Sequence, residues 1–294
     1  MEIQNEEISG GSKCVKVKAR AKINLSLDII GKRHDGYHDI KTIMQTVELC
    51  DRLMISVAER DIEVECDCDK VPPGKRNIAY KAAELFIKRY RINRGVKIII
   101  EKNIPVASGL AGGSADAAAV IKGMDRLFNC GADKTDLVHM GREIGADVPF
   151  CIKGGTVLAE GIGDVLTKLT PLPRTHILIV TPCIEVSTQW VYENLDTSRI
   201  IKRPDIRMLL EFIRKGRVDL LAKNMVNVLE TITAGKYPVI NTIKEKLKDH
   251  GALGSVMSGS GPSVFGIFSD KHLAREAYKA CVNEGWNVFI TEIS

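Results

Sequence analysis

The chain has 294 residues, of which 45% are hydrophobic and 27% are charged. This composition is typical of a soluble globular protein with one large or two ordinary domains, and it excludes disordered, fibrous and collagen-like chains. The formal net charge is only +5, and the basic residues occur as scattered doublets, so neither a nucleic-acid partner nor a membrane partner is expected.

The chain also lacks the marks of export. Its first seven residues are polar and acidic, unlike a secretory leader, and no apolar run reaches the length that a bilayer requires. The eight cysteines form neither a C-x-x-C pair nor the Cys/His spacing of a zinc site. We therefore expect a cytoplasmic protein with reduced cysteines.

Apolar and polar residues alternate from Val15 to Ile29, which predicts a long strand, or a pair of strands, with one buried face. A glycine turn is expected at residues 31–36. Asn77 is a good N-cap residue for a helix. The pattern up to residue 145 predicts strands at 53–57, 62–66 and 95–101, and helices at 77–90, 114–128 and 134–144.

Gly145 is expected to end a helix in the left-handed conformation, and β structure is expected to return after Pro149. Residues 171–173 read Pro-Leu-Pro and are the best linker candidate. The remaining segments are predicted as strands at 157–159, 165–169 and 175–182, mainly helices over 187–250, strands at 255–257 and 263–268, a helix at 271–283 and a strand at 287–292. Because strands and helices are mixed without strict βαβ alternation, we predict an α+β fold.

The glycines are unevenly placed, with eleven of the 25 in residues 109–163 and five in 251–266. The first cluster lies in the loop 105–115, between a predicted strand and a helix of small residues. Such a loop presents backbone N–H groups and a positive helix end to a phosphate. It matches neither the Walker A loop, nor G-x-G-x-x-G, nor the protein-kinase motifs. Three glycines and two serines at a helix start favour anion binding over a turn that serves packing alone.

The second cluster, residues 257–263, joins two predicted strands and by itself predicts only a hairpin loop. The histidines, cysteines and aspartates show no metal-ligand spacing anywhere in the sequence. Any metal ion is therefore expected to arrive with a nucleotide.

Two charged residues lie in unusual surroundings. Lys22 stands in an apolar alternating stretch, where the default expectation is a solvated lysine on the face opposite Ile23. Asn24 shares its face, and this polar pair favours a functional role. Asp147 follows a predicted helix end, where an aspartate either forms a turn or acts as a general base. Sequence spacing does not decide between these roles.

Five segments together resemble the GHMP kinases, the family of the galacto-, homoserine, mevalonate and phosphomevalonate kinases. Residues 105–118 and 258–263 resemble the second and third motifs of the family. Residues 21–25, 35–38 and 145–149 are similar to the branch that phosphorylates a cytidine diphosphate derivative of methylerythritol. The segments occur in the expected order and span nearly the whole chain.

The resemblance implies two α+β lobes with the active site in the cleft between them, which we place at residues 1–170 and 171–294. It implies transfer of a phosphoryl group from ATP, with Mg²⁺, to the 2-hydroxyl of 4-(cytidine 5'-diphospho)-2-C-methyl-D-erythritol in the non-mevalonate isoprenoid pathway. Asp147 is implied as the general base, and Lys22 as a donor to the hydroxyl or to Asp147. This division suits phosphoryl transfer, which depends on positioning and charge neutralisation.

The same resemblance implies the binding residues. Those expected near ATP are Asn77 and Lys102 at the adenosine, and Pro105, Val106, Ala107, Ser108, Gly109, Leu110, Ala111, Gly112, Gly113, Ser114 and Ala115 around the triphosphate. Those expected near the cytidine diphosphate group are Asn24, Tyr37, His38, Thr188 and Tyr192. Tyr37 and Tyr192 are expected to stack on cytosine while His38 bonds its edge.

Three questions stay open at this point. Another GHMP small-molecule kinase, such as mevalonate or homoserine kinase, is the alternative activity, and a nucleotide-binding protein without catalysis is the alternative class. Because Gly112 and Gly113 precede Ser114, the hydroxyl that ligates Mg²⁺ is not defined. Asp116 either complements the helix dipole or, if it faces the loop, repels a triphosphate.

Overall fold

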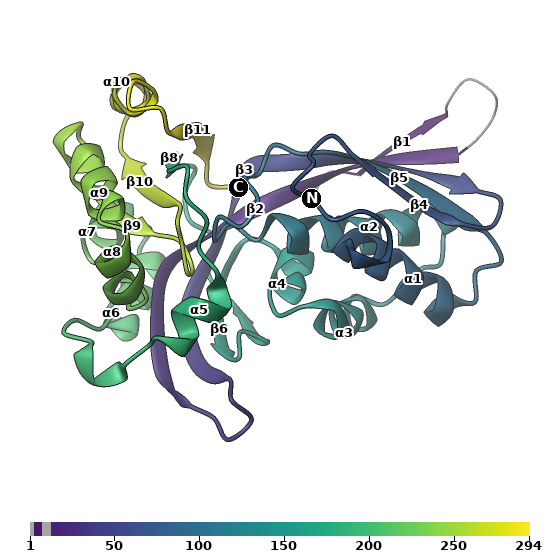
Figure 1. The fold of residues 1–294 in the computed structure, drawn as a ribbon, viewed down its shortest axis with the longest axis horizontal. Helices are drawn as coiled ribbons and strands as arrows, with labels where there is room; N and C mark the ends of the chain where they lie inside the picture. Colours follow the sequence, from purple (N-terminus) through teal and green to yellow (C-terminus); the bar gives the residue numbers. More distant parts are fainter. Residues whose placement is uncertain (1–2, 8–12) are drawn as a thin grey trace. The chain divides into compact units, whose positions relative to one another are not determined.

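The computed structural model describes residues 3–7 and 13–294, and the chain divides into two compact units (Figure 1). Unit 1 contains Met1–Ala21, Cys50–Val106 and Ala111–Gly154, and unit 2 contains Lys22–Leu49, Ala107–Leu110 and Gly155–Ser294. Two long strands, β2 and β3, each contribute residues to both units. The lobe boundary at residues 170–171 remains a prediction, whereas the mixed helix and strand content confirms the α+β class.

Unit 1 is a sheet covered by helices. Its strands follow the order β1-β2-β3-β5-β4, in which β4 pairs parallel with β5 while the pairs β1/β2 and β3/β5 are antiparallel. The strands are β1 (Ile3–Glu7), β2 (Lys13–Lys32), β3 (His38–Ala58), β4 (Ile62–Cys66) and β5 (Gly95–Glu101). The helices are η1 (Gly74–Arg76), α1 (Ile78–Tyr90), α2 (Gly112–Phe128), α3 (Lys134–Ile144) and α4 (Val148–Lys153).

Helix α2 packs directly against this sheet because its inner face carries small residues. Alanines and Gly123 occupy that face, and a Cβ at Gly123 would lie 2.5 Å from the Ile55 Cδ1 atom and 3.0 Å from the Val17 Cγ2 atom. Figure 1 shows α1 to α4 together on one side of the sheet. Close packing therefore sets the position of α2 on the sheet of unit 1.

Unit 2 is built on an antiparallel sheet of strand order β11-β8-β10-β9. These strands are β8 (His176–Thr181), β9 (Gly254–Met257), β10 (Val264–Phe268) and β11 (Asn287–Glu292), while β6 (Thr156–Gly161) pairs with β3 and β7 (Val165–Lys168) with β6. The helices are α5 (Thr188–Glu193), η2 (Thr197–Arg199), α6 (Ile206–Arg214), α7 (Val218–Lys223), α8 (Glu230–Lys236), α9 (Val239–Asp249) and α10 (Lys271–Val282).

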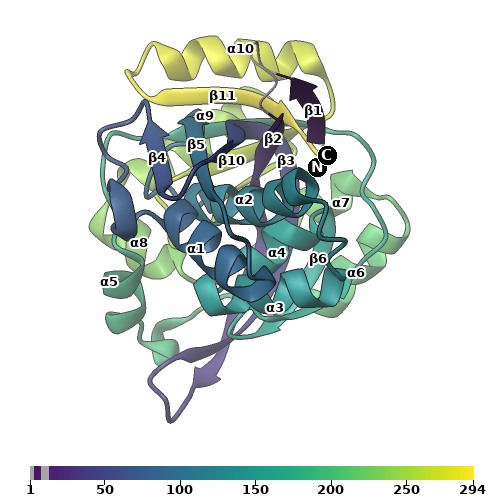
Figure 2. The ribbon, with the colours of Figure 1, turned by 90° about the vertical axis from the view of Figure 1, so that its right-hand side faces the viewer.

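The core of unit 2 lies between this sheet and helices α9 and α10. Ile240, Ile243 and Leu247 repeat at helical spacing on α9 and are fully buried with strand residues such as Val180 and Phe268. Figure 2 shows α10 running alongside β11. This packing holds the β9–β10 turn, which contains the second glycine cluster.

Most predicted elements are confirmed. The Asn77 side chain caps α1 by accepting a hydrogen bond from the Ala79 N–H at 2.8 Å, and the helix 134–144 and the strand 287–292 have the expected bounds. The β9–β10 turn confirms the predicted hairpin loop. All eight cysteines are free. No helix of the described chain has the length and apolarity to cross a membrane.

The strands expected at 15–29 and 53–57 are confirmed and extend further, as parts of β2 and β3, which are 20 and 21 residues long, because pairing in the sheet carries extended structure through polar positions. Two expectations are wrong. The segment around Pro149 is helix α4. A proline is tolerated in the first turn of a helix because the backbone N–H that it lacks would have no acceptor within the helix. Gly145 is extended, with φ of 179°, and is not left-handed.

Candidate active site

The loop predicted to hold the triphosphate ends at an uncapped helix. Ala111 adopts a left-handed conformation at the N-cap of α2, with φ of 57°, and its side chain does not cap the helix. Free N–H groups at a helix start attract anions. A Cβ at Gly112 would lie 3.1 Å from the Ile104 Cγ2 atom, and one at Gly113 would lie 3.3 Å from the Ile78 Cγ2 atom. These two glycines therefore allow close packing, and the first N–H groups of α2 are the candidates for anion binding.

The middle of this loop, residues 107–110, is held by the β9–β10 turn within unit 2. The Ser258 hydroxyl donates to the Gly109 carbonyl at 3.0 Å, and the Ser263 N–H donates to the Ser108 carbonyl at 3.2 Å. Gly109 has a φ of 79°, and a Cβ there would lie 2.2 Å from the Ser258 carbonyl oxygen. The two glycine clusters of the sequence thus meet at Gly109, where only glycine fits.

The β9–β10 turn is itself fixed by buried polar side chains. The Asn227 amide nitrogen donates to the carbonyls of Met257 and Gly259 at 2.8 and 2.7 Å. The Thr233 hydroxyl donates to the Ser260 carbonyl at 3.0 Å. Because these bonds are shielded from water, the turn is held in one conformation. Asn227 and Thr233 carry no sequence signal of this role, since single polar residues in helical segments are common.

Lys22 is buried, with 4% of its surface exposed, so the expected solvated lysine is wrong. The Lys22 ammonium donates to the Asn24 Oδ1 atom at 2.7 Å, which shows that the predicted polar pair is in contact. A Cβ at Gly259 would lie 3.4 Å from the Lys22 Nζ atom, so the glycine turn covers this face of β2. The Lys22 N–H also donates to the Leu110 carbonyl at 3.1 Å. Lys22 therefore lies beside both glycine segments.

Asp147 belongs to unit 1, whereas Lys22 belongs to unit 2. Asp147 is half-buried at the N-cap position of α4, but its side chain does not cap that helix. The carboxylate is therefore not committed to the helix start, where most N-cap aspartates are used. The pairing of Asp147 with Lys22 remains a prediction.

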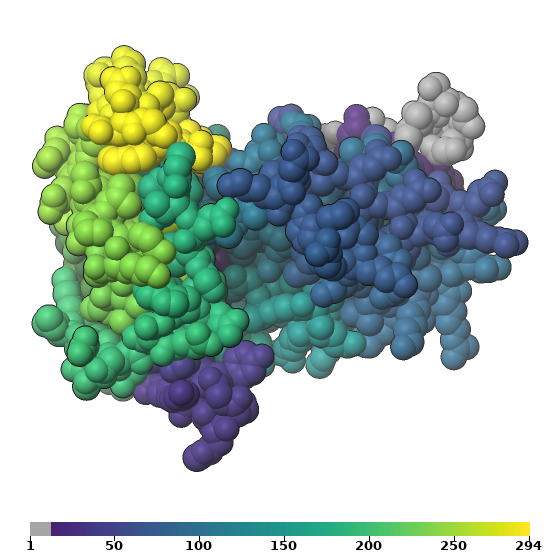
Figure 3. All heavy atoms as spheres, in the orientation of Figure 1, coloured from purple at the N-terminus to yellow at the C-terminus, as the bar shows by residue number. Residues whose placement is uncertain are grey.

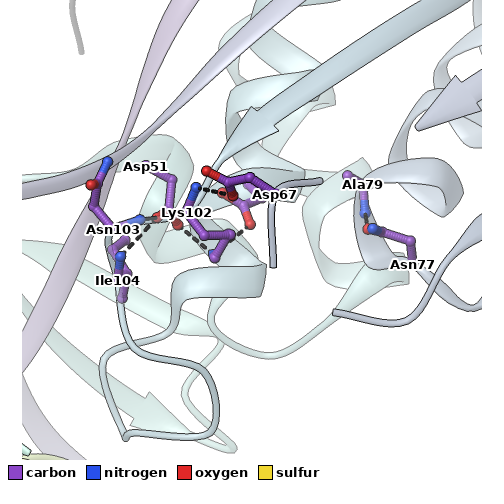
Figure 4. Close-up of polar contacts among 8 residues, drawn as sticks. Asp51, Asp67, Asn77, Ala79, Lys102, Asn103 and Ile104 are labelled. Carbon is purple, nitrogen blue, oxygen red and sulfur yellow. Dashed lines mark hydrogen bonds and ion pairs between the residues drawn. The ribbon is translucent and has the colours of Figure 1, made fainter. Parts of the chain in front are cut away.

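A buried charge cluster lies beside the start of α2 (Figure 4). The Lys102 ammonium donates to the Asp116 Oδ2 atom at 2.8 Å and also to Asp51, and all three side chains are at most 5% exposed. The Asp51 Oδ1 atom accepts from the N–H groups of Asn103 and Ile104 at 2.6 and 2.8 Å. Asp51 thereby anchors the segment that enters the glycine loop. Sequence reasoning missed Asp51, which lies among strand-forming residues and matches no motif.

The cluster contains two carboxylates and one ammonium. Burial, together with the charge of Asp51, raises the pKa of Asp116 to about 8 despite the opposing effect of Lys102. Burial acts to lower the pKa of Lys102, but the two carboxylates outweigh it and raise that pKa. Asp116 is therefore protonated more readily than an ordinary carboxyl group. Its carboxyl group contacts Lys102.

The residues expected near adenosine both have structural partners. The Asn77 Oδ1 atom is used in capping α1, and the Lys102 ammonium is used by the two aspartates. Each group can donate further hydrogen bonds, since the Asn77 amide also carries two N–H donors and the Lys102 ammonium has three. Contact of either residue with adenosine remains a prediction.

The residues expected near the cytidine group are all in unit 2. The rings of His38 and Tyr192 lie 5.4 Å apart at an interplanar angle of 37°. Tyr37 is 64% exposed at the turn between β2 and β3, and the Thr188 Oγ1 atom lies 2.8 Å from the Ser260 Oγ atom. Figure 3 shows this turn protruding from unit 2 beside the segment that carries α5. The structure thus pairs Tyr192 with His38, and stacking by Tyr37 remains a prediction.

The state of His38 suits recognition by hydrogen bonds. Burial, followed by the charge of Lys32, lowers the pKa of the His38 imidazole. A neutral imidazole offers one donor and one acceptor at pH 7. A ring of this kind next to an aromatic face can bind the polar edge of a planar heterocycle.

Comparison with known proteins agrees with this geometry. Residues 77–155 match the GHMP kinases N terminal domain, and residues 209–287 match the GHMP kinases C terminal domain. A 4-diphosphocytidyl-2-C-methyl-D-erythritol kinase of Acetivibrio thermocellus is 55% identical over 278 residues, which cover 95% of this chain and 98% of the relative.

Solved structures extend the comparison. A crystal structure of 4-(cytidine 5'-diphospho)-2C-methyl-D-erythritol kinase has a TM-score of 0.83 and 30% identity, with 95% of this chain and 99% of that chain covered. The homoserine kinase from Cytophaga hutchinsonii, with a TM-score of 0.76, 20% identity and coverage of 96% and 94%, shares the fold.

The chain therefore belongs to the GHMP kinases and, within them, to the 4-diphosphocytidyl-2-C-methyl-D-erythritol kinase family. As a member it is an ATP-dependent kinase of isoprenoid biosynthesis that acts on a hydroxyl group.

The raised pKa of Asp116 predicts a pH-dependent stability. Between the ordinary carboxyl pKa and about 8, the folded protein holds a proton that the unfolded chain has released, so the free energy of unfolding falls as the pH rises. Asp116→Asn removes this titration. In urea unfolding at pH 5, 6.5 and 8, the stability of D116N relative to the natural protein should increase steadily with pH.

The matched control is Asp219→Asn. Arg217 lowers the pKa of the partly exposed Asp219 to about 2, so Asp219 is ionised in both states over this range and D219N should show no trend. A constant difference between D116N and the natural protein from pH 5 to 8 would contradict the raised pKa of Asp116.

Proposed function

We propose that this chain, in the cytoplasm, transfers the γ-phosphoryl group of ATP to the 2-hydroxyl of 4-(cytidine 5'-diphospho)-2-C-methyl-D-erythritol in the non-mevalonate isoprenoid pathway. The observation that carries the proposal is the buried Lys22 ammonium beside the two joined glycine segments. The substrate is inferred from relatives that bear this activity in their names and match nearly the whole chain.

In the proposed reaction, Asp147 accepts the proton of the 2-hydroxyl. At the same time, the oxygen of this hydroxyl forms a bond to the γ-phosphorus atom of ATP. The bond between the γ-phosphorus and the bridging oxygen of ATP breaks, and ADP leaves. Lys22 orients the hydroxyl or the Asp147 carboxylate and neutralises negative charge. Its burial strengthens these interactions, because the local dielectric constant is lower than that of water.

The triphosphate is proposed to bind at residues 105–115, with its charge on the uncapped N–H groups of α2. Asn77 and Lys102 are proposed to face the adenosine. Mg²⁺ is proposed to arrive with ATP, where it neutralises phosphate charge. No cluster of three or more His, Cys, Asp or Glu side chains in the described residues is placed to bind an ion alone.

The cytidine end is proposed to bind at the aromatic pair of unit 2. Tyr192 offers a stacking face, and the neutral His38 imidazole bonds the cytosine edge. Tyr37 is proposed to cover the opposite face of the base, and its exposure leaves its ring accessible. Asn24 and Thr188 are proposed to contact the polar remainder of the substrate. An acceptor without a nucleobase needs none of these aromatic groups.

The general base is tested by Asp147→Asn. The neutral amide has the same shape but accepts no proton, so kcat should fall at least about 100-fold, the usual contribution of a general base. The dissociation constant of ATP, measured by calorimetry, should change little because no phosphate contact is removed. Asp133→Asn is the matched control, since asparagine caps α3 as well as aspartate does. A D147N enzyme with near-natural kcat refutes the assignment.

The aromatic pair is tested by Tyr192→Ala. Loss of a stacking face costs about 1–3 kcal/mol, so the KM for the cytidylated substrate should rise about tenfold while the KM for ATP stays constant. Tyr192→Phe should retain near-natural values. Tyr278→Ala, which removes another half-buried tyrosine of unit 2, should leave both KM values unchanged. The proposal fails if Y192A and Y278A behave alike in steady-state kinetics.

A further inference from the structure

A short hydrogen-bond chain leads from Lys22 across strands β2 and β3, within the parts of them that belong to unit 2. The Lys22 ammonium donates to the Asn24 Oδ1 atom at 2.7 Å, and the Asn24 Nδ2 atom donates to the Thr42 Oγ1 atom at 2.8 Å. The Thr42 hydroxyl donates to the Ser26 carbonyl at 2.6 Å. The chain therefore ends on a backbone group of β2 itself.

Each link of this chain has one possible direction. The Ser26 carbonyl only accepts, so the single proton of the Thr42 hydroxyl is used there. The Thr42 oxygen must then accept from Asn24, which requires the amide nitrogen of Asn24 to point toward it. The Lys22 ammonium only donates, and it meets the amide oxygen. Thr42 therefore selects one of the two orientations of the Asn24 amide.

Burial makes this selection strict. Thr42 and Ser26 are 0% exposed, and Asn24 is 2% exposed. Water does not easily replace a lost partner at such positions. With the amide reversed, its N–H groups would face the Lys22 ammonium, donor against donor, and the hydrogen bond between Lys22 and Asn24 would be lost.

We infer that Thr42 is a positioning residue for the phosphoryl transfer: it fixes the Asn24 amide, which in turn fixes the Lys22 ammonium. The inference rests on the role of Lys22 in the proposed function. It assigns Thr42 to the reaction although Thr42 contacts neither ATP nor the acceptor in this account. No sequence signal marks it, since a threonine in a strand is ordinary.

The test is Thr42→Val, which keeps the shape of the side chain and removes the hydroxyl. Without the hydroxyl, the Asn24 amide is no longer held in the orientation that accepts from the Lys22 ammonium, so kcat should fall at least about tenfold. The KM for ATP should change less than about threefold, because the phosphate loop is untouched. Thr42→Ser restores the hydroxyl and should recover kcat to within about threefold of the natural value. If T42V does not fold, Thr42→Ala, which adds no bulk, gives the same comparison.

Thr156→Val is the matched control for a merely structural effect. Thr156 is also a buried strand threonine whose hydroxyl bonds an amide side chain, that of Gln45, at 2.7 Å. T156V removes an equivalent bond outside the Lys22 chain and should retain natural kcat. The inference is overturned if T42V keeps its kcat, if T156V loses as much, or if T42S fails to recover.

A further variant separates this inference from the proposed function. Lys22→Met should abolish turnover if Lys22 acts in the reaction. Near-natural turnover of K22M would overturn the role of Lys22 and the inference together. An inactive K22M combined with a fully active T42V would overturn the role of Thr42 alone.

Discussion

The hydrogen bond from the Ser258 hydroxyl to the Gly109 carbonyl is the contact on which the candidate site depends. The same hydroxyl accepts from the Asn24 N–H at 3.2 Å, so one oxygen joins the first glycine loop, the β9–β10 turn and strand β2. Since Gly109 leaves no space for a Cβ, the two loops approach backbone to backbone. This contact sets the position of Lys22 relative to residues 108–110.

Two buried lysine side chains have different partners. Lys102 bonds the carboxyl groups of Asp51 and Asp116, and burial raises the pKa of Asp116. Lys22 bonds a neutral amide whose direction is fixed by the sheet.

The sequence predicted the local features well. The Asn77 cap, the amphipathic helices and the closing strand follow from periodicity and end signals, which act over a few residues. The sequence-based prediction failed where contacts with distant segments of the chain determine the structure. The first part of β3 gains its extended form from its neighbours, and the burial of Lys22 depends on a turn more than 230 residues away along the chain. The roles of Asp51 and Thr42 likewise exist only through long-range contacts.

The central claim concerns the acceptor, and ADP release measures it directly. The purified protein is assayed with ATP, Mg²⁺ and one of three alcohols: 4-(cytidine 5'-diphospho)-2-C-methyl-D-erythritol, mevalonate or homoserine. The account predicts a kcat/KM for the cytidylated alcohol at least about 100-fold above that for either other compound, because only that compound engages Tyr192 and His38. Equal or faster ADP release with mevalonate or homoserine would contradict it.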